Sequence, residues 1–253
     1  MANVILTTRS MFPSARAIRD SLEELTGRRI FLTEAPKRNH RVILRWGSSL
    51  KVADDADLIN CENVVATCAN KGLFSSLLDG SDIPHPSFFR REPAAGEFPI
   101  LVRTTLTGFG GAGIIPCRNL DEWRAYANHY WTHYEPLQSE FRVHVAGGTI
   151  LKVFRKIAAN EEAEQDEFKI RNLHRGYRFS LVDFSGKRKM VDFITNLWEK
   201  LGFGNGVCAF DIGWMSRGEY FVLEGNSAPG LSENDDTLRK YVEYFTSYVE
   251  KRL

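Results

Sequence analysis

The residues with the clearest chemical potential lie near the C-terminus, in the stretch 208–231. Apolar and β-prone residues flank the turn-forming Gly218, and this pattern predicts a two-stranded hairpin. Counted outward from a two-residue loop, Asp211 faces Glu224 across the hairpin. Asn226 shares the face of Glu224, because alternate residues of a strand point to the same side. The hairpin is therefore expected to gather two carboxylates and an amide at one point.

Two carboxylates that face each other across a strand ladder repel, and a bound divalent cation would turn this repulsion into attraction. Carboxylate and amide oxygens suit Mg²⁺ or Mn²⁺ rather than zinc. We therefore interpret Asp211, Glu224 and Asn226 as metal ligands. The alternative is a solvated edge hairpin whose acidic residues have no joint role.

Length and composition fit a globular protein of one large domain or a few small lobes. The chain has 253 residues, of which 43% are hydrophobic and 26% charged. The formal net charge of +1 predicts no general attraction to nucleic acid. The sequence contains no apolar run long enough to indicate a membrane span. Its first residues are typical of a strand rather than of a signal peptide. The four cysteines lack C-x-x-C spacing, which favours reduced thiols and a cytoplasmic protein, or one of the host cytoplasm if a phage encodes it.

Short strands and helices alternate along the chain, which predicts an α/β protein with α+β lobes. We expect a helix over 14–26, with Ser14 as its cap, and a second helix from Asn70 to Leu78, before a proline-rich turn. The acidic segment 158–169 reads as a mobile loop or an exposed helix. Further strands are expected over 4–8, 41–46, 99–104, 114–115, 141–145 and 149–154, and further helices over 120–130, 188–201 and 238–253.

A glycine-rich segment, 107–113, lies between two of the expected strands. Glycines allow close backbone approach, and successive N–H groups can cradle a phosphate, although the spacing is not that of a P-loop or a Rossmann motif. Arg103 leads into this segment and offers an anion a bidentate fork. Lys71 stands at a helix start, where an anionic ligand would offset an unfavourable position for a cation. Each feature also has a structural explanation, namely a hairpin tip, a surface ion pair or a solvated lysine.

Basic residues concentrate behind the acidic segment, at Arg171, Arg175 and Arg178. This cluster suits an anionic substrate or a polyphosphate, and nucleic-acid binding is the alternative. The balanced net charge and the lack of interleaved aromatic residues argue against nucleic acid, which we do not expect as a partner. Motifs of serine hydrolases and zinc proteases are absent.

These pieces occur in the order typical of the ATP-grasp superfamily, and the sequence resembles its carboxylate–amine ligases over roughly 60–235. These ligases include D-alanine–D-alanine ligases, glutathione synthetases, ribosomal-protein glutamate ligases and phage-type carboxylate–amine ligases. The stretch 211–231 is similar to the motif D … E-x-N-x-x-P-G-[LF]. The run 171–176 resembles R-S-N-L-H-R-G with one residue missing, and 140–145 resembles E-[YF]-R-V-H-V. The segment 70–86 is similar to the lysine-led helix and I-P-x-P turn.

The resemblance implies an ATP-grasp fold of three lobes. These are a pre-grasp α/β lobe over 1–68, a central lobe over 69–136 with the glycine-rich loop, and a C-terminal lobe over 137–253 with the metal site. Asp211, Glu224 and Asn226 would hold one or two Mg²⁺ or Mn²⁺ ions against ATP. The residues implied for ATP binding are Lys71, Arg103, Gly110, Gly111, Gly113, Glu135, Leu137 and Lys156, and those implied for catalysis at the acyl phosphate or acceptor are Arg142 and Arg171.

Two positions depart from the pattern of these relatives. Arg103 replaces the commoner lysine but keeps its charge, and Gln138 stands where a basic residue is frequent. These departures leave the nucleotide preference open.

By this resemblance the protein would be an ATP-dependent ligase that forms an amide bond through an acyl phosphate and releases ADP and phosphate. Its partners would be ATP and amino-acid-like or peptide-like carboxylate and amine substrates, with no membrane, and a homodimer is one option for its assembly. The alternatives are a kinase-like ATP-grasp phosphotransferase and a nucleotide-binding module without catalysis.

Overall fold

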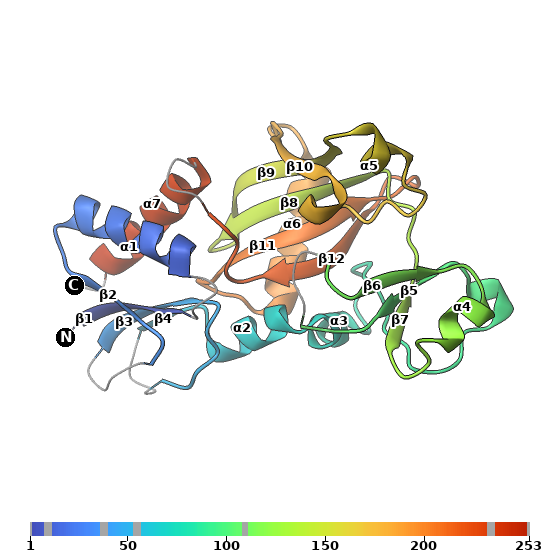
Figure 1. The fold of residues 1–253 in the computed structure, drawn as a ribbon. Coiled ribbons are helices and arrows are strands. Elements are labelled where there is room, and N and C mark those ends of the chain that lie inside the picture. The colour runs from blue at the N-terminus through green and yellow to red at the C-terminus, as the bar shows by residue number, and fades with distance from the viewer. Residues whose placement is uncertain are drawn as a thin grey trace.

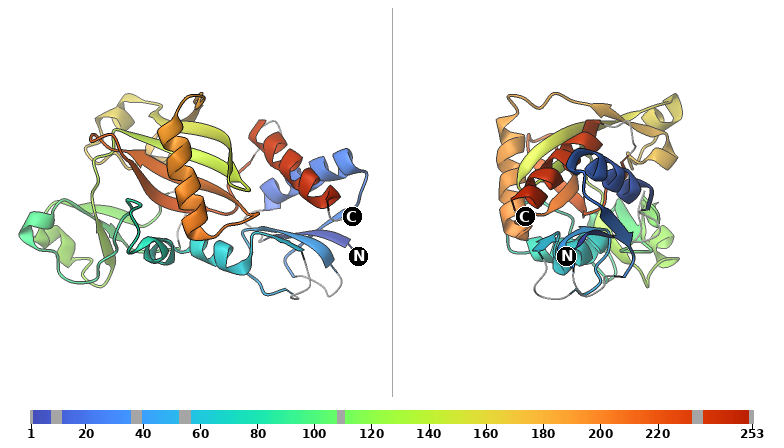
Figure 2. Two further views of the ribbon diagram at one scale, coloured as in Figure 1. Left: turned by 180° about the vertical axis from the view of Figure 1, so that it is seen from behind. Right: turned by 90° about the vertical axis from the view of Figure 1, so that its left-hand side faces the viewer.

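The computed structural model describes residues 2–7, 12–35, 40–52, 57–107, 111–231 and 236–251. Within these ranges the strands form three separate sheets of four, three and five strands (Figure 1). Helices pack against the first and the largest sheet, as Figure 2 shows from two further sides. None of the described helices is long and apolar enough to span a bilayer.

The first sheet is parallel, with the strand order β2-β1-β3-β4. Its strands are β1 (Ala2–Thr7), β2 (Ile30–Thr33), β3 (His40–Trp46) and β4 (Asp57–Ile59). Helix α1 (Phe12–Thr26) provides the crossover that two neighbouring parallel strands require. Helix α7 (Asp236–Glu250) joins the same apolar core, so the last helix of the chain packs with its first strands.

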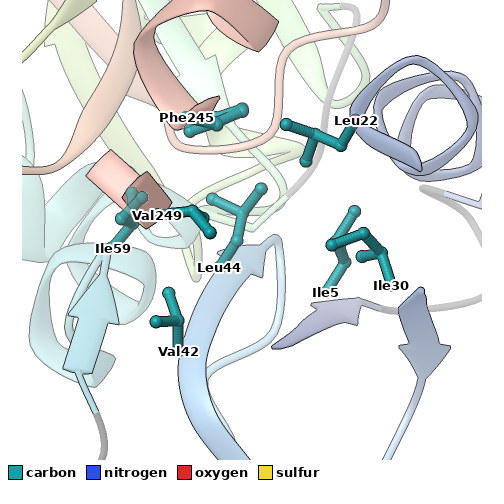
Figure 3. A pocket seen from close by; sticks show the side chains of 8 residues that line it. All are labelled: Ile5, Leu22, Ile30, Val42, Leu44, Ile59, Phe245 and Val249. Carbon is teal, nitrogen blue, oxygen red and sulfur yellow. The ribbon is translucent and has the colours of Figure 1, made fainter. Parts of the chain in front are cut away.

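Apolar side chains from this sheet and from both helices surround a cavity of about 20 Å³, toward which they point in Figure 3. They are Ile5, Leu22, Ile30, Val42, Leu44, Ile59, Phe245 and Val249. A cavity without polar side chains in its lining offers water no hydrogen-bond partners and stays dry. We therefore interpret it as a packing gap in the core.

The three-stranded sheet is antiparallel, with the order β6-β5-β7. Its elements are β5 (Ile100–Arg103), β6 (Ile114–Cys117) and β7 (Tyr130–His133), flanked by η2 (Ala95–Glu97) and α4 (Leu120–Arg124). One face buries Val102 against Trp131. Because strand residues alternate, Leu101 and Arg103 lie on the other face, where Phe168 and Ile170 pack against Leu101.

The five-stranded sheet is antiparallel and carries the order β10-β9-β8-β11-β12. Its strands are β8 (Ser139–Ala146), β9 (Thr149–Ala158), β10 (Tyr177–Leu181), β11 (Val207–Trp214) and β12 (Tyr220–Asn226). Helix α6 (Arg188–Leu201) covers one face and buries Val143 and Phe210 (Figure 2). The alternate residues Arg142 and Asp211 therefore face the other side, which we call the open face.

Short helices complete the surroundings of this sheet. Helices α2 (Glu62–Ala69) and α3 (Lys71–Leu78) pack against β12, and α5 (Glu161–Gln165) and η3 (Leu173–Arg175) connect β9 to β10. The helices expected over 70–78 and 188–201 are confirmed, as is the hairpin that contains 141–154. The acidic segment contains α5, so its interpretation as an exposed helix is correct for this part.

Two local expectations are wrong. Helix α1 begins at Phe12, so Ser14 is not its cap; the Ser14 hydroxyl instead accepts a hydrogen bond of 2.9 Å from the N–H of Leu231. The helix expected over 120–130 ends at Arg124. A turn follows it, and Tyr130 already belongs to strand β7, which pairs with β5. The four cysteines are free thiols, as expected.

Candidate active site

The hairpin of β11 and β12 places Asp211 opposite Glu224, as the sequence predicts. Its turn is longer than the two residues expected, because Trp214 pairs with Tyr220. Continued unchanged, this register would place Asp211 opposite Leu223, one residue away from Glu224. A β-bulge beside Asp211 restores the register, since Leu223 has no partner of its own in β11. The bulge therefore decides that the two carboxylates face each other.

Asp211 is buried and bound by basic side chains from two other strands. Arg142 on β8 donates from Nε to Oδ1 at 2.7 Å and from Nη2 to Oδ2 at 2.9 Å. Lys156 on β9 donates from Nζ to Oδ2 at 2.7 Å. The planar guanidinium of Arg142 makes a bidentate contact that a lysine could not reproduce.

These contacts determine the charge state of the cluster. Burial disfavours the charged form of Asp211, but Arg142 and Lys156 outweigh it and hold the pKa of Asp211 well below its usual range. Burial also opposes the charged form of Arg142, yet Asp211 raises the pKa of its guanidinium. The pKa of Lys156 is raised as well, because Asp211 and Glu140 outweigh the effect of burial. All three contacting groups are therefore charged at neutral pH.

Glu140 is part of this cluster, although it was not predicted as a site residue. It is 5% exposed, and its Oε1 accepts a hydrogen bond from Nζ of Lys156. Burial raises the pKa of Glu140, against the opposing charge of Lys156. A signal was present in the sequence, because Glu140 precedes Arg142 by two positions and must share its strand face.

Glu224 is bound from helix α3. Nζ of Lys71 lies 3.0 Å from Oε2 of Glu224. The side chain of Asn70 caps this helix by accepting hydrogen bonds from the N–H groups of Gly72 at 3.0 Å and Leu73 at 3.2 Å. Since a cation is unfavourable at a helix N-terminus, the Glu224 carboxylate explains the position of Lys71.

Arg103 lies at the end of β5 and borders the same cluster. Its Nε is buried and has no hydrogen-bond partner among the residues that the structure describes. Burial lowers the pKa of Arg103, while the negative charges of Glu224 and Glu140 act in the opposite direction. A buried cation with an unused donor fits an anionic ligand better than a surface ion pair.

The connector between the small sheet and the five-stranded sheet contains Glu135 and Leu137. The N–H of Leu137 donates to the carbonyl oxygen of Glu135 at 2.9 Å. Nη2 of Arg171 donates to the carbonyl oxygen of Leu137 at 2.9 Å, and the charge of Arg171 also acts on the pKa of Glu140. Arg171 therefore fixes the connector and borders the charged cluster.

The described part of the glycine-rich segment approaches the basic run. Gly111 and Gly113 have left-handed φ angles of 78° and 73°. A Cβ atom on Gly111 would lie 2.1 Å from Nδ2 of Asn172, so only glycine allows this close approach. Gly110, which the sequence also predicts to bind ATP, lies outside the described residues.

Asn226 pairs with Ala209 and shares the strand face of Glu224, and its Oδ1 accepts a hydrogen bond of 3.0 Å from the N–H of Ala228. In the described part of the chain, no three His, Cys, Asp or Glu side chains group as a metal site. Magnesium commonly uses one or two protein carboxylates and completes its shell with water and phosphate oxygens. In this structure basic side chains bind Asp211 and Glu224, so the role of Asp211, Glu224 and Asn226 as metal ligands stays a prediction.

Comparison with known proteins identifies the fold. No family model and no curated protein sequence matches the chain. A D-alanine–D-alanine ligase from Bacillus anthracis has a TM-score of 0.71 at 11% identity, and the match covers 99% of this chain and 96% of that one. The ATP-grasp ligase PsnB with a minimal precursor has a TM-score of 0.69 at 12% identity, with 100% of both chains covered. A RimK domain ATP-grasp protein from Sphaerobacter thermophilus has a TM-score of 0.67 at 15% identity, with 96% and 99% covered.

The matches to these solved structures extend over nearly the whole of this chain. The protein therefore has the ATP-grasp fold that the sequence predicts. At these sequence identities the similarity establishes the fold and not the activity, which depends on the residues of the site.

Proposed function

We propose that this protein is an ATP-dependent carboxylate–amine ligase, which forms an amide bond and releases ADP and phosphate. The observation that carries the proposal is the charged cluster on the open face of an ATP-grasp sheet. Its basic members are Lys71, Arg103, Arg142 and Lys156, and its acidic members are Glu140, Asp211 and Glu224. Because four basic groups meet three acidic ones, the cluster favours an anionic ligand.

Solved relatives of the fold support a nucleotide as that ligand. PsnB has been solved with Mg and ADP, and also with its precursor peptide PsnA2 and AMPPNP. In our proposal ATP lies between the central lobe, 69–136, and the C-terminal lobe, 137–253, with the pre-grasp lobe, 1–68, beside the acceptor. These lobe boundaries belong to the proposal.

The proposed nucleotide site uses three groups of residues. Lys71, Arg103 and Lys156 face the phosphates, which the segment with Gly110, Gly111 and Gly113 covers. The backbone of Glu135 and Leu137 faces the adenine. Asp211, Glu224 and Asn226 would hold Mg²⁺ or Mn²⁺, which supplies further neutralisation of the phosphate charge.

The chemistry follows from positioning and electrostatics. A substrate carboxylate oxygen bonds to the γ-phosphorus of ATP, and the bond from that phosphorus to ADP breaks. An amine nitrogen then bonds to the acyl carbon, phosphate departs with the former carboxylate oxygen, and the nitrogen loses a proton. Arg142 and Arg171 hold the reacting carboxylate and stabilise negative charge on the acyl phosphate. Water would hydrolyse this intermediate, and the proposed apolar cover on one side is Phe168 and Ile170, which pack on Leu101.

The test is ADP release, screened over amino acids and short peptides, with mass spectrometry of the products. Glu224→Gln should abolish ADP release and leave the protein folded. Glu219→Gln is the matched control, because Glu219 is exposed at the tip of the same hairpin. Full activity of Glu224→Gln would contradict the site.

The same assay separates the two other candidate functions. A phosphorylated product that forms without an amine would indicate a kinase-like ATP-grasp phosphotransferase. Binding of an ATP analogue without ADP release under any condition would indicate a nucleotide-binding module.

A further inference from the structure

Strand β10 is the outermost strand of the five-stranded sheet. β9 pairs with one of its sides, and no strand of the described ranges pairs with the other (Figure 1). It follows the basic run after η3 and ends at Leu181. Its outer side is therefore an open strand edge next to the proposed site.

The backbone groups that face outward can be identified from the ladder. The N–H of Ala159 donates to the carbonyl of Gly176 at 2.8 Å, and the N–H of Val182 donates to the carbonyl of Val153 at 2.9 Å. Backbone groups alternate in direction along an antiparallel strand, so the even-numbered residues of β10 face β9. The N–H and C=O groups of Phe179 and Leu181 consequently point to the open edge.

The side chains of these two residues form an exposed apolar strip on the open face. Phe179 is 37% exposed and Leu181 is 62% exposed. The guanidinium of Arg142 lies 4.9 Å from the centroid of the Phe179 ring, and Phe154 packs at 6.2 Å from that ring. The strip is therefore continuous with the charged cluster, and exposed apolar surface beside a site indicates a binding role.

The opposite face of this edge is basic. Arg178 on β10 and Arg155 on β9 are exposed there, and neither forms an ion pair with a described residue. An added strand would present its alternate side chains to the two faces. Apolar residues would meet Phe179 and Leu181, and acidic residues would meet the two arginines.

We propose that the outer edge of β10 binds an extended peptide in which apolar and acidic residues alternate, and that this peptide is a substrate of the ligase. The peptide extends the sheet by one strand, which is a known mode of peptide recognition. The apolar strip leads it toward Arg142. This proposal names the substrate class of the proposed function and depends on it.

Peptide binding is measured without ATP, so that the result does not depend on ligase activity. The probe is a fluorescently labelled, end-blocked heptapeptide with the sequence Glu-Leu-Glu-Leu-Glu-Leu-Glu, followed by fluorescence anisotropy. Saturable binding is expected, weakened at least about tenfold when serine replaces leucine or lysine replaces glutamate in the peptide. Absence of saturable binding, or equal binding of all three peptides, would overturn the proposal.

Two variants of Leu181 test the location. Leu181→Pro removes the outward N–H together with the leucine side chain, and proline is tolerated on the solvent side of an edge strand. It should therefore weaken binding about tenfold with an unchanged circular dichroism spectrum. Leu181→Asp should also weaken binding, whereas Leu25→Asp, at an equally exposed leucine of α1, should not. Unchanged binding in both Leu181 variants would refute this edge as the site.

Two further outcomes are informative. Light scattering that shows a dimer of the wild type and a monomer of Leu181→Asp would assign the edge to a second copy and overturn the peptide proposal. ADP release with free amino acids, in the absence of peptide binding, would leave the ligase proposal standing and refute only the peptide substrate.

Discussion

Arg142 and Asp211 are cross-strand neighbours on β8 and β11, and two hydrogen bonds of 2.7 Å and 2.9 Å join them. The Asp211 side chain is almost fully buried, whereas that of Arg142 reaches the open face. One residue of this pair thus carries a buried negative charge, and the other connects that charge to the proposed acceptor site. The pair links the stability of the sheet to its proposed chemistry.

Arg142→Ala should lower the free energy of unfolding by about 3 kcal/mol, because it leaves Asp211 buried with a lost partner. This value lies at the low end of the stability loss that follows when a buried ion pair is broken, because Lys156 still contacts Asp211. Urea denaturation gives the measurement. Arg188→Ala is the control, because this fully exposed arginine lies 4.0 Å from Asp192 and should change stability by less than about 0.5 kcal/mol. Equal effects of the two changes would contradict the prediction.

Arg171→Ala should reduce ligation about 100-fold and change the affinity for an ATP analogue much less, because a cation at the acyl phosphate acts mainly on the transition state. Calorimetry with the analogue and the ADP-release assay separate the two effects. Arg175→Ala is the neighbouring control, since Arg175 is exposed. A parallel loss of both quantities would place Arg171 in the nucleotide site, through its hydrogen bond to the carbonyl of Leu137.

Gly111→Ala should lower the free energy of unfolding by about 1–2 kcal/mol, because a side chain is strained at a φ of 78° and its Cβ would displace Asn172. Thermal denaturation provides the comparison. Gly96→Ala is the matched control, since a Cβ there meets nothing within 4 Å and the residue has no positive φ. Equal melting temperatures of the Gly111 and Gly96 variants would show that this turn tolerates a side chain.

The low pKa of Glu97 in the folded protein predicts that part of the stability of the fold is lost in acid. Hydrogen bonds from Arg91, together with one from the N–H of Ala94, lower the pKa of Glu97 to about 2 in the folded protein. In the unfolded chain an ordinary Glu titrates at about 4.3, so these bonds stabilise the fold above that pH and lose their effect as the pH falls toward 2.

Glu97→Gln should therefore lower the melting temperature at pH 7, and the difference from the wild type should shrink between about pH 4 and pH 2. The control is Glu92→Gln, a change of the same kind at an exposed neighbour. A difference that stays constant over this range would show that the charge of Glu97 does not contribute to stability.

Features with a strong local signal were determined by the sequence. Helix α6 has a regular apolar stripe, α3 has the capping residue Asn70, and the hairpin of β11 and β12 has apolar strands around a Gly-containing turn. The facing of Asp211 and Glu224 was predicted from this hairpin. The order of motifs along the chain also predicted the ATP-grasp fold. The lobe boundaries and the roles in ATP and metal binding stay predictions.

Other features depend on partners that are distant in the chain. The short strands β2, β4, β7 and β10 were not expected, because each of them is stabilised mainly by its neighbours in the sheet. The β-bulge at Leu223 could not be predicted, because the alternation of apolar and polar residues does not indicate it. It nevertheless decides that Glu224 faces Asp211.

The charged cluster itself was decided by tertiary structure. Glu140, Lys156 and Asp211 come from three strands, and only the order β9-β8-β11 brings their side chains together. The packing of α7 with the first sheet likewise joins the two ends of the chain. Ion pairs and core contacts between distant segments leave no periodic signal in a sequence, because their geometry exists only once the sheets have formed.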